Sequence, residues 1–299
     1  MKMLESAELG EPFMARNLTV FPLNLADPGP EFATLDQGLS AGTVVVHETG
    51  EVAWAELDVR PDGGQPVFIL DGEGLVGARQ NRVVNTAILA EAGRSHRIPV
   101  SCVEQGRWQG GAGFSGGSSA YPSLRAILAS SVRASLRAGR GFGADQGRVW
   151  QSVSARLSRL RVSSATSSMH DAYAGAEKVT EAFLDAVELE NACGFMAFAG
   201  EEFVGLDLLS GPVTFASLRR KLLESYALDA LVRMGKPCGF TRREEGERVI
   251  SQLRGLGWQD FPGVSLGTEA RAEDSGLVAR ALVHEGKLVS LSSFARAEI

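Results

Sequence analysis

The stretch FILDGEGLVGARQNRVVNTAILAEAG (residues 68–93) indicates two β-strands joined by a loop that carries an unusual set of polar side chains. Apolar and β-branched runs are typical of strands, and Gly and Asp mark the loop between them. Asp71 and Glu73 close the first run, and the triplet Gln80-Asn81-Arg82 opens the second. The stretch therefore predicts a β-rich region with polar side chains gathered where its strands end.

The remainder of the first 115 residues has the same character. Short runs rich in Val, Ile and Thr alternate with Gly, Pro and Asp, a spacing typical of an antiparallel sandwich or barrel. The predicted strands are residues 17–23, 42–48, 53–60, 65–73, 82–89 and 97–104.

Helices and two further hairpins are expected after this β-rich half. Helical spacing of apolar residues follows Pro122 and the N-cap candidate Asp145, and recurs in 176–188 and 213–234. Strand pairs are expected over 194–209 and 277–294, the second turning near Glu285-Gly286. The predicted fold class is α+β, with an antiparallel, sandwich- or barrel-like N-terminal half packed with helices and C-terminal hairpins. We expect one domain over residues 15–295, and a Gly/Ser-rich mobile loop at 110–121 within it.

Three carboxylates follow predicted strands and are the candidate catalytic residues. Asp71 and Glu73 share one face if their strand continues, and Glu104 holds the same end position after the strand 97–104. Carboxylates at such loops serve as acid and base or hold a divalent metal. The alternative is an Asp71-Gly72 hairpin turn with Glu104 as a solvated loop acid.

Four nearby side chains are the candidate ligand contacts: Gln80, Asn81, Arg82 and Arg107. Their hydrogen-bond donors suit a polar, anionic ligand, although Asn and Gln also order loops by bonding to the backbone. If the loop folds back so that Gln80-Asn81-Arg82 lies beside Asp71-Gly72-Glu73, Arg82 is expected to pair with Asp71, Glu73 or Glu104.

The helix predicted over 213–234 carries an acid on its apolar stripe. Asp229 follows Phe215, Leu218, Leu222 and Tyr226 on that stripe. Because a buried ionised carboxylate is costly without a partner, Asp229 either pairs with an arginine or belongs to a site together with Tyr226.

Positive charge is concentrated in residues 94–161. This segment contains eleven arginines, no lysine and only two acids, so it carries +9 in a chain of −6, which leaves −15 for the remainder. The arginines pair with acids elsewhere in the fold, contact a phosphate-bearing ligand, or bind nucleic acid.

Composition and motifs exclude several classes of protein. The three cysteines form no CxxC pair, the N-terminus has no apolar signal segment, and no run is long enough to span a bilayer, which together indicate a soluble cytoplasmic protein. A Walker loop is absent.

The block PVFILDGEGLVGARQNRVVNTAILAEAGRSHRIPVSCVEQGRW (residues 66–108) resembles the central block of the ADP-ribosylglycohydrolase- and rhodanese-phosphatase-associated domain family. The segments DQGRVW, VGLDLL, KLLESYALDAL and GTEARAE resemble its later blocks in the same order, so the resemblance extends from about residue 15 to 295. Gly74 stands where the family usually has a second acid.

The resemblance implies a role near NAD and ADP-ribose metabolism, without naming a reaction, metal or cofactor. We therefore expect a domain that binds or processes an ADP-ribose-like nucleotide, with possible protein partners in ADP-ribose processing. A non-catalytic interaction module and a nucleic-acid-binding protein that uses residues 94–161 are the alternatives. Neither enzymatic activity nor oligomeric state follows from the sequence.

Overall fold

The computed structural model describes residues 6–51, 53–59, 64–233 and 241–296. The chain forms two compact units: residues 1–31, 177–262 and 267–299 make unit 1, and residues 32–176 and 263–266 make unit 2. Cys238 and the ends of two predicted elements, at residues 60 and 234, lie outside the described residues. The α+β class is confirmed by antiparallel sheets, a closed barrel and helices. The single-domain expectation stays a prediction.

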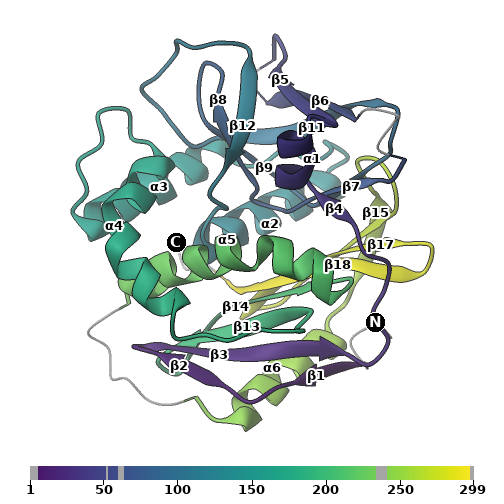
Figure 1. Cartoon of the computed structure of the whole chain (residues 1–299), viewed down its shortest axis with the longest axis vertical. Coiled ribbons are helices and arrows are strands. Elements are labelled where there is room, and N and C mark those ends of the chain that lie inside the picture. Colours follow the sequence, from purple (N-terminus) through teal and green to yellow (C-terminus); the bar gives the residue numbers. More distant parts are fainter. Residues whose placement is uncertain (1–5, 52, 60–63, 234–240, 297–299) are drawn as a thin grey trace. The chain divides into compact units, whose positions relative to one another are not determined.

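Unit 1 is built on a nine-stranded antiparallel sheet in the order β1-β3-β13-β14-β18-β17-β16-β15, with β2 paired to β3. The hairpins predicted at 194–209 and 277–294 are confirmed as β13–β14 and β17–β18, and Glu285 and Gly286 take positive φ at the second turn. The long helix α5 packs on β13 and β14, as Figure 1 shows. The elements are β1 (Ala7–Leu9), β2 (Phe13–Ala15), β3 (Leu18–Leu25), β13 (Gly194–Ala199), β14 (Glu202–Leu209), α5 (Pro212–Leu231), α6 (Arg243–Gly255), β15 (Gln259–Pro262), β16 (Thr268–Glu273), β17 (Leu277–His284) and β18 (Lys287–Ala295).

Unit 2 contains a closed barrel in the order β11-β6-β5-β12-β8-β9 and a small sheet β10-β7-β4. Inward residues such as Val46, Leu57, Val84 and Val100 fill one apolar cluster inside it. The elements are β4 (Ala33–Thr34), α1 (Leu35–Ala41), β5 (Val44–Glu48), β6 (Trp54–Val59), β7 (Val67–Ile69), β8 (Gly74–Gly77), β9 (Arg82–Val84), β10 (Ile88–Ala90), β11 (Ser95–Cys102), β12 (Gly113–Gly117), α2 (Pro122–Arg137) and α3 (Gln146–Leu160). Helix α4 (Met169–Leu184) continues from unit 2 into unit 1.

Two sequence predictions need correction in unit 2. The segment 110–121 contains a barrel strand, β12, where the sequence indicated only a loop, because its backbone pairs with β5 and β8 although its glycines offer few side chains. Its mobility stays a prediction. The predicted strand 82–89 is two strands, β9 and β10, which belong to different sheets.

Candidate functional site

The loop between β7 and β9 brings the two polar motifs together, as the sequence predicted. Leu75 on β8 pairs with Arg82 on β9, and the Val84 amide donates to the Glu73 carbonyl at 2.9 Å. The predicted strand 65–73 ends earlier, however: β7 stops at Ile69 and the chain turns at Gly72, whose φ is +81°. A Cβ there would meet Arg125 Cγ at 2.8 Å, so the turn requires glycine.

Asp71 forms a buried ion pair with Arg125 of α2. The Arg125 Nε and Nη2 atoms donate to Asp71 Oδ2 at 3.2 and 3.1 Å, and the two side chains are 0% and 5% exposed. The sequence placed Arg125 in the basic segment but did not connect it to the site. Its place among the apolar positions of α2, beside Leu124 and Leu128, was the available signal that it is buried.

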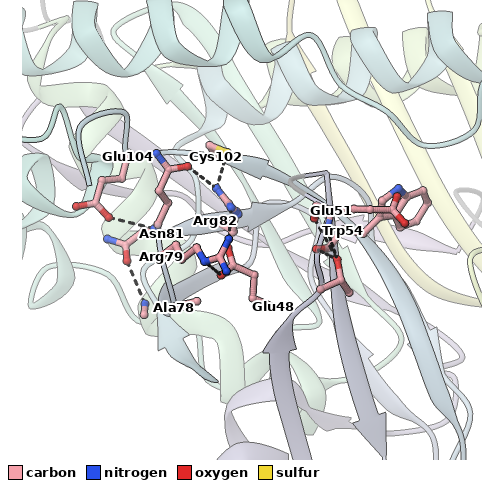
Figure 2. Close-up of polar contacts among 12 residues, drawn as sticks. Glu48, Glu51, Trp54, Ala78, Arg79, Asn81, Arg82, Cys102 and Glu104 are labelled. Atoms are coloured by element: carbon pink, nitrogen blue, oxygen red, sulfur yellow. Dashed lines mark hydrogen bonds and ion pairs between the residues drawn. The ribbon is translucent and has the colours of Figure 1, made fainter. Parts of the chain in front are cut away.

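Arg82 is buried, but its predicted partner was wrong. Its ion pair is with Glu48, at 3.1 Å between Nη2 and Oε1, and its Nη1 donates to Gln80 Oε1 at 2.9 Å and to Cys102 Sγ. Figure 2 shows the Arg82 guanidinium between Cys102 and Glu48.

Strand alternation explains this arrangement. Glu48, Arg82 and Cys102 lie two residues beyond the inward-facing core residues Val46, Val84 and Val100 of their strands. Because alternate strand residues share a face, all three project toward the barrel interior at one end. We call Glu48, Gln80, Arg82 and Cys102 the barrel plug.

A second cluster joins Glu104, Arg107 and Asn81. The Glu104 carboxylate accepts hydrogen bonds from Arg107 Nε at 3.0 Å, from the backbone amide of Asn81 at 3.1 Å and from Thr166 Oγ1 at 2.8 Å. Burial alone raises the pKa of Glu104, but the hydrogen bonds from Arg107, Asn81 and Thr166 outweigh it and hold that pKa below its usual value. Glu104 is therefore a stable anion.

Arg107 is held by the protein on every side of its guanidinium. Besides the bond to Glu104, Nη1 donates to the carbonyls of Ala78 at 2.8 Å and Gln109 at 3.0 Å, and Nη2 donates to the Gly77 carbonyl at 3.1 Å and Asn81 Oδ1 at 2.9 Å. These contacts engage its five N–H groups. Arg107 therefore fixes the loop after β8 against the loop after β11.

The loop that Arg107 fixes presents Trp108 to solvent. The Trp108 side chain is 57% exposed and, among the described residues, forms no hydrogen bond or ring contact. On one flank, the amide of Gly106 donates to the Thr166 carbonyl at 2.9 Å. On the other flank, Gly110 lies directly against the Ala78 carbonyl. We call residues 105–112 the rim loop.

The hollows next to these residues are small or acidic. The cavity lined by Asn81, Arg82 and His170 has about 10 Å³, room for roughly one water molecule. An open groove of about 440 Å³ between α1 and β12 is lined by Asp36, and its lining contains no cation. Neither hollow suits a phosphate-bearing ligand. Within the described ranges, no group of three or more His, Cys, Asp or Glu could hold a metal ion.

Gly74, the departure from the family pattern, has no room for a side chain, because a Cβ there would collide with the Ser118 carbonyl oxygen. Glu73, next to it, is 1% exposed. The ligand-contact and catalytic roles of the predicted residues stay predictions.

Tyr226 and Asp229 lie in unit 1, whereas the other predicted site residues lie in unit 2. The Tyr226 hydroxyl donates to Asp207 Oδ2 at 2.9 Å, and Asp229 Oδ2 lies 3.8 Å from Arg233 Nη2. In the nine-stranded sheet of unit 1, Glu269 pairs with Arg271 at 2.9 Å and with Arg280 at 3.1 Å. All three residues are 1% exposed. Glu269 and Arg271 are two residues apart on β16, so strand alternation places them on one face.

The eleven arginines of residues 94–161 divide into groups. Arg94, Arg97, Arg107 and Arg125 pair with acids, which agrees in part with internal pairing. Five others, within the parts of the chain that the structure describes, have no acidic partner: Arg137, Arg140, Arg148, Arg159 and Arg161.

Fold and site together define an α+β protein whose signature residues form ion pairs and hydrogen bonds at one end of a six-stranded barrel. The chain matches the ARPP-1 family, described as the ARG and Rhodanese-Phosphatase-superfamily-associated Protein domain, over residues 6–294, and it belongs to that family. No curated protein and no solved structure matches it. Within the described part of the chain, no helix combines the length and apolar content needed to cross a bilayer.

Proposed function

We propose that the protein binds a phosphate-bearing nucleotide of the ADP-ribose type at the rim loop of unit 2. The observation that carries this proposal is Trp108, a 57% exposed indole on a loop that Arg107 and Glu104 hold in place. An exposed aromatic ring stacks on a nucleobase with about 1–3 kcal/mol per base. A loop already fixed before binding loses little conformational freedom when the ligand arrives.

Positive charge for the phosphates comes from the C-terminal end of α3. The rim loop contacts Thr166, and Arg161 precedes Thr166 by five residues, so their Cα atoms lie within about 18 Å. Arg159 and Arg161 are exposed, and neither has an acidic partner among the described residues. Arginine matches phosphate oxygens with paired N–H donors.

The polar residues predicted as the site support this surface in the proposal. Asn81, Glu104 and Arg107 hold the rim loop, while Gln80 and Arg82 close the barrel beneath it. Asp71 and Glu104 engage arginines, which favours binding over acid–base chemistry by these two acids. ADP-ribose is the first ligand to test because the sequence resemblance links the family to ADP-ribosylglycohydrolases.

The test is calorimetric titration of the protein with ADP-ribose, with ADP and ribose 5-phosphate titrated separately. We expect Trp108→Ala to weaken ADP-ribose binding about tenfold, because the stacking contact is lost. We expect the double variant R159Q/R161Q to weaken it by a similar factor, whereas R242Q/R248Q, at exposed positions of unit 1, is the matched control and leaves binding unchanged. ADP-ribose binding that is insensitive to Trp108→Ala would overturn the assignment of the site.

The second candidate function is a non-catalytic protein-interaction module, and the exposed Trp108 favours it. Exposed tryptophans are frequent anchors of protein interfaces. If the wild-type protein binds none of the three ligands, the nucleotide proposal is refuted. A Trp108-dependent protein complex would then support the interaction module.

A further inference from the structure

Helix α3 has a solvent face that runs along its whole length. The exposed positions follow helical periodicity and carry small or uncharged polar side chains, with Arg159 at the C-terminal end: Gly147, Gln151, Ser154, Ala155, Ser158 and Arg159. The opposite face packs Val149, Val153 and Leu157 inward. This solvent face is therefore a surface feature and not an unfilled part of the core.

The helix and the loop after it contain no acid. Residues 146–170 include four arginines but neither Asp nor Glu, in a chain with a net charge of −6. Asp145, directly before the helix, accepts a hydrogen bond from the Arg148 amide as the N-cap. Since repulsion by a carboxylate would weaken the binding of any polyanion, a surface of this length without one favours such a ligand.

The arginines that have no acidic partner among the described residues form a line and not a single cluster. Arg148 and Arg159 are eleven residues apart, so they lie on nearly the same side of α3 and about 16 Å apart along its axis. Arg137 and Arg140 lie at the end of α2 and in the loop that leads into α3, beyond Arg148. Arg161 lies at the other end, next in the chain to the loop that contacts the rim loop.

We propose that this line of arginines binds a linear polymer of phosphate-linked nucleotides, which follows the solvent face of α3 and the segment between α2 and α3. The inference rests on the proposed nucleotide site at Trp108, where one nucleotide of the polymer stacks, and it extends the ligand from a single nucleotide to a chain. Charges spaced over three helical turns match repeated phosphates better than the two adjacent phosphates of one nucleotide.

The polarity of the surface favours a nucleotide polymer over an acidic protein segment. Protein interfaces are centred on buried apolar anchors, whereas nucleotide polymers bind through positive, polar surfaces with an occasional stacking ring. The α3 face has hydroxyl, amide and guanidinium groups along its length. An acidic peptide is therefore the alternative that the experiment has to reject.

The experiment is fluorescence anisotropy with labelled single-stranded RNA, single-stranded DNA and poly(ADP-ribose), each long enough to span α3. The test variant R137Q/R140Q/R148Q changes the arginines toward the α2 end of the line and leaves Arg159 and Arg161 in place. The matched control R220Q/R242Q/R248Q removes the same charge from exposed positions of unit 1. We expect the test variant to bind at least one polymer about tenfold or more weaker. The slope of log affinity against log salt should fall by about 2, because each lost phosphate contact contributes about 0.7.

The outcomes separate this inference from the proposed function. If the test variant binds every polymer as the wild type does, the line of arginines is not the site and the inference is overturned. ADP-ribose binding at Trp108 is tested separately, by calorimetry. If ADP-ribose does not bind but a polymer binds in an Arg148-dependent manner, the single-nucleotide proposal fails and the polymer surface remains. Equal, variant-sensitive binding of a poly-glutamate peptide would overturn the assignment to nucleotides. Comparison of the affinities for RNA, DNA and poly(ADP-ribose) identifies which nucleotide polymer the surface binds.

Discussion

Replacement of Glu104 by Gln should destabilise unit 2 through the cluster that holds the rim loop. The substitution keeps the shape but removes the negative charge from a carboxylate that accepts from Arg107, the Asn81 amide and Thr166. A Gln amide offers only one acceptor oxygen, so its NH₂ group faces a donor that it cannot satisfy.

The expected magnitude follows from the burial of the two partners. Removing one member of a buried ion pair costs about 3–5 kcal/mol, and a hydrogen bond to a charged group is worth about 1.5–3 kcal/mol. The Arg107 side chain is 29% exposed and can be rehydrated when its partner is lost. We therefore expect Glu104→Gln to lower the free energy of unfolding by about 2–3 kcal/mol, near the range for a hydrogen bond to a charged group. In a chain of 299 residues, that corresponds to a melting temperature lower by roughly 3–5 °C.

The measurement is thermal unfolding followed by circular dichroism from pH 3 to 8. The folded-state pKa of Glu104 lies below its ordinary 4.5, so its charge contributes stability that is fully present above about pH 4.5 and is lost as pH falls through the folded-state value. The difference between wild type and Glu104→Gln should therefore shrink in acid. The control Glu91→Gln, which removes an exposed pair with Arg94, should cost less than about 1 kcal/mol. A difference that is small at pH 7, or constant down to pH 3, would refute the reasoning.

Three further predictions concern other parts of the chain. Glu31→Ala should destabilise unit 1 by about 1–2 kcal/mol in urea unfolding, because Glu31 accepts from the amides of Val213 at 3.1 Å and Thr214 at 2.6 Å at the start of α5; an unchanged midpoint would contradict this cap. Gly110→Ala should disorder the rim loop, since a Cβ there collides with the Ala78 carbonyl, and should be visible as faster amide exchange around Trp108. In a Cys238→Ser background, Cys102 and Cys193 should react with a thiol reagent only on unfolding, because burial raises both thiol pKa values; rapid reaction in the folded state would show otherwise.

The sequence predicted elements well where one local signal was strong. The hairpin β17–β18 has a Glu-Gly turn between two apolar runs, and α3 has the N-cap Asp145, whose side chain accepts from the Arg148 amide. Strand β12 was not predicted because its glycines carry no hydrophobic pattern and Phe114 is its single apolar side chain, which packs in the barrel core. Helix α6 was not predicted either, although Val249, Ile250 and Leu253 form its buried stripe.

The site was predictable only over short distances along the chain. The approach of the two polar motifs was foreseen because the loop between them is short, although that loop contains strand β8, which was not predicted. The partner of Arg82 was not, because Glu48 lies 34 residues away on a strand that becomes its neighbour only when the barrel closes. The inward alternation of Val46 and Glu48 carries that information, but only once the register of the barrel is known.

The division of the chain between the two units has a consequence for its synthesis. Strand β3 ends at Leu25, and its neighbour β13 begins at Gly194, after nearly all of unit 2 has been made. At about 5–20 residues per second, β3 waits roughly 10–30 seconds on the ribosome without that partner. During this interval unit 2 can close its barrel, whereas the first strands of unit 1 expose unpaired backbone and apolar side chains. We therefore expect premature chains that end before Gly194 to aggregate through β3.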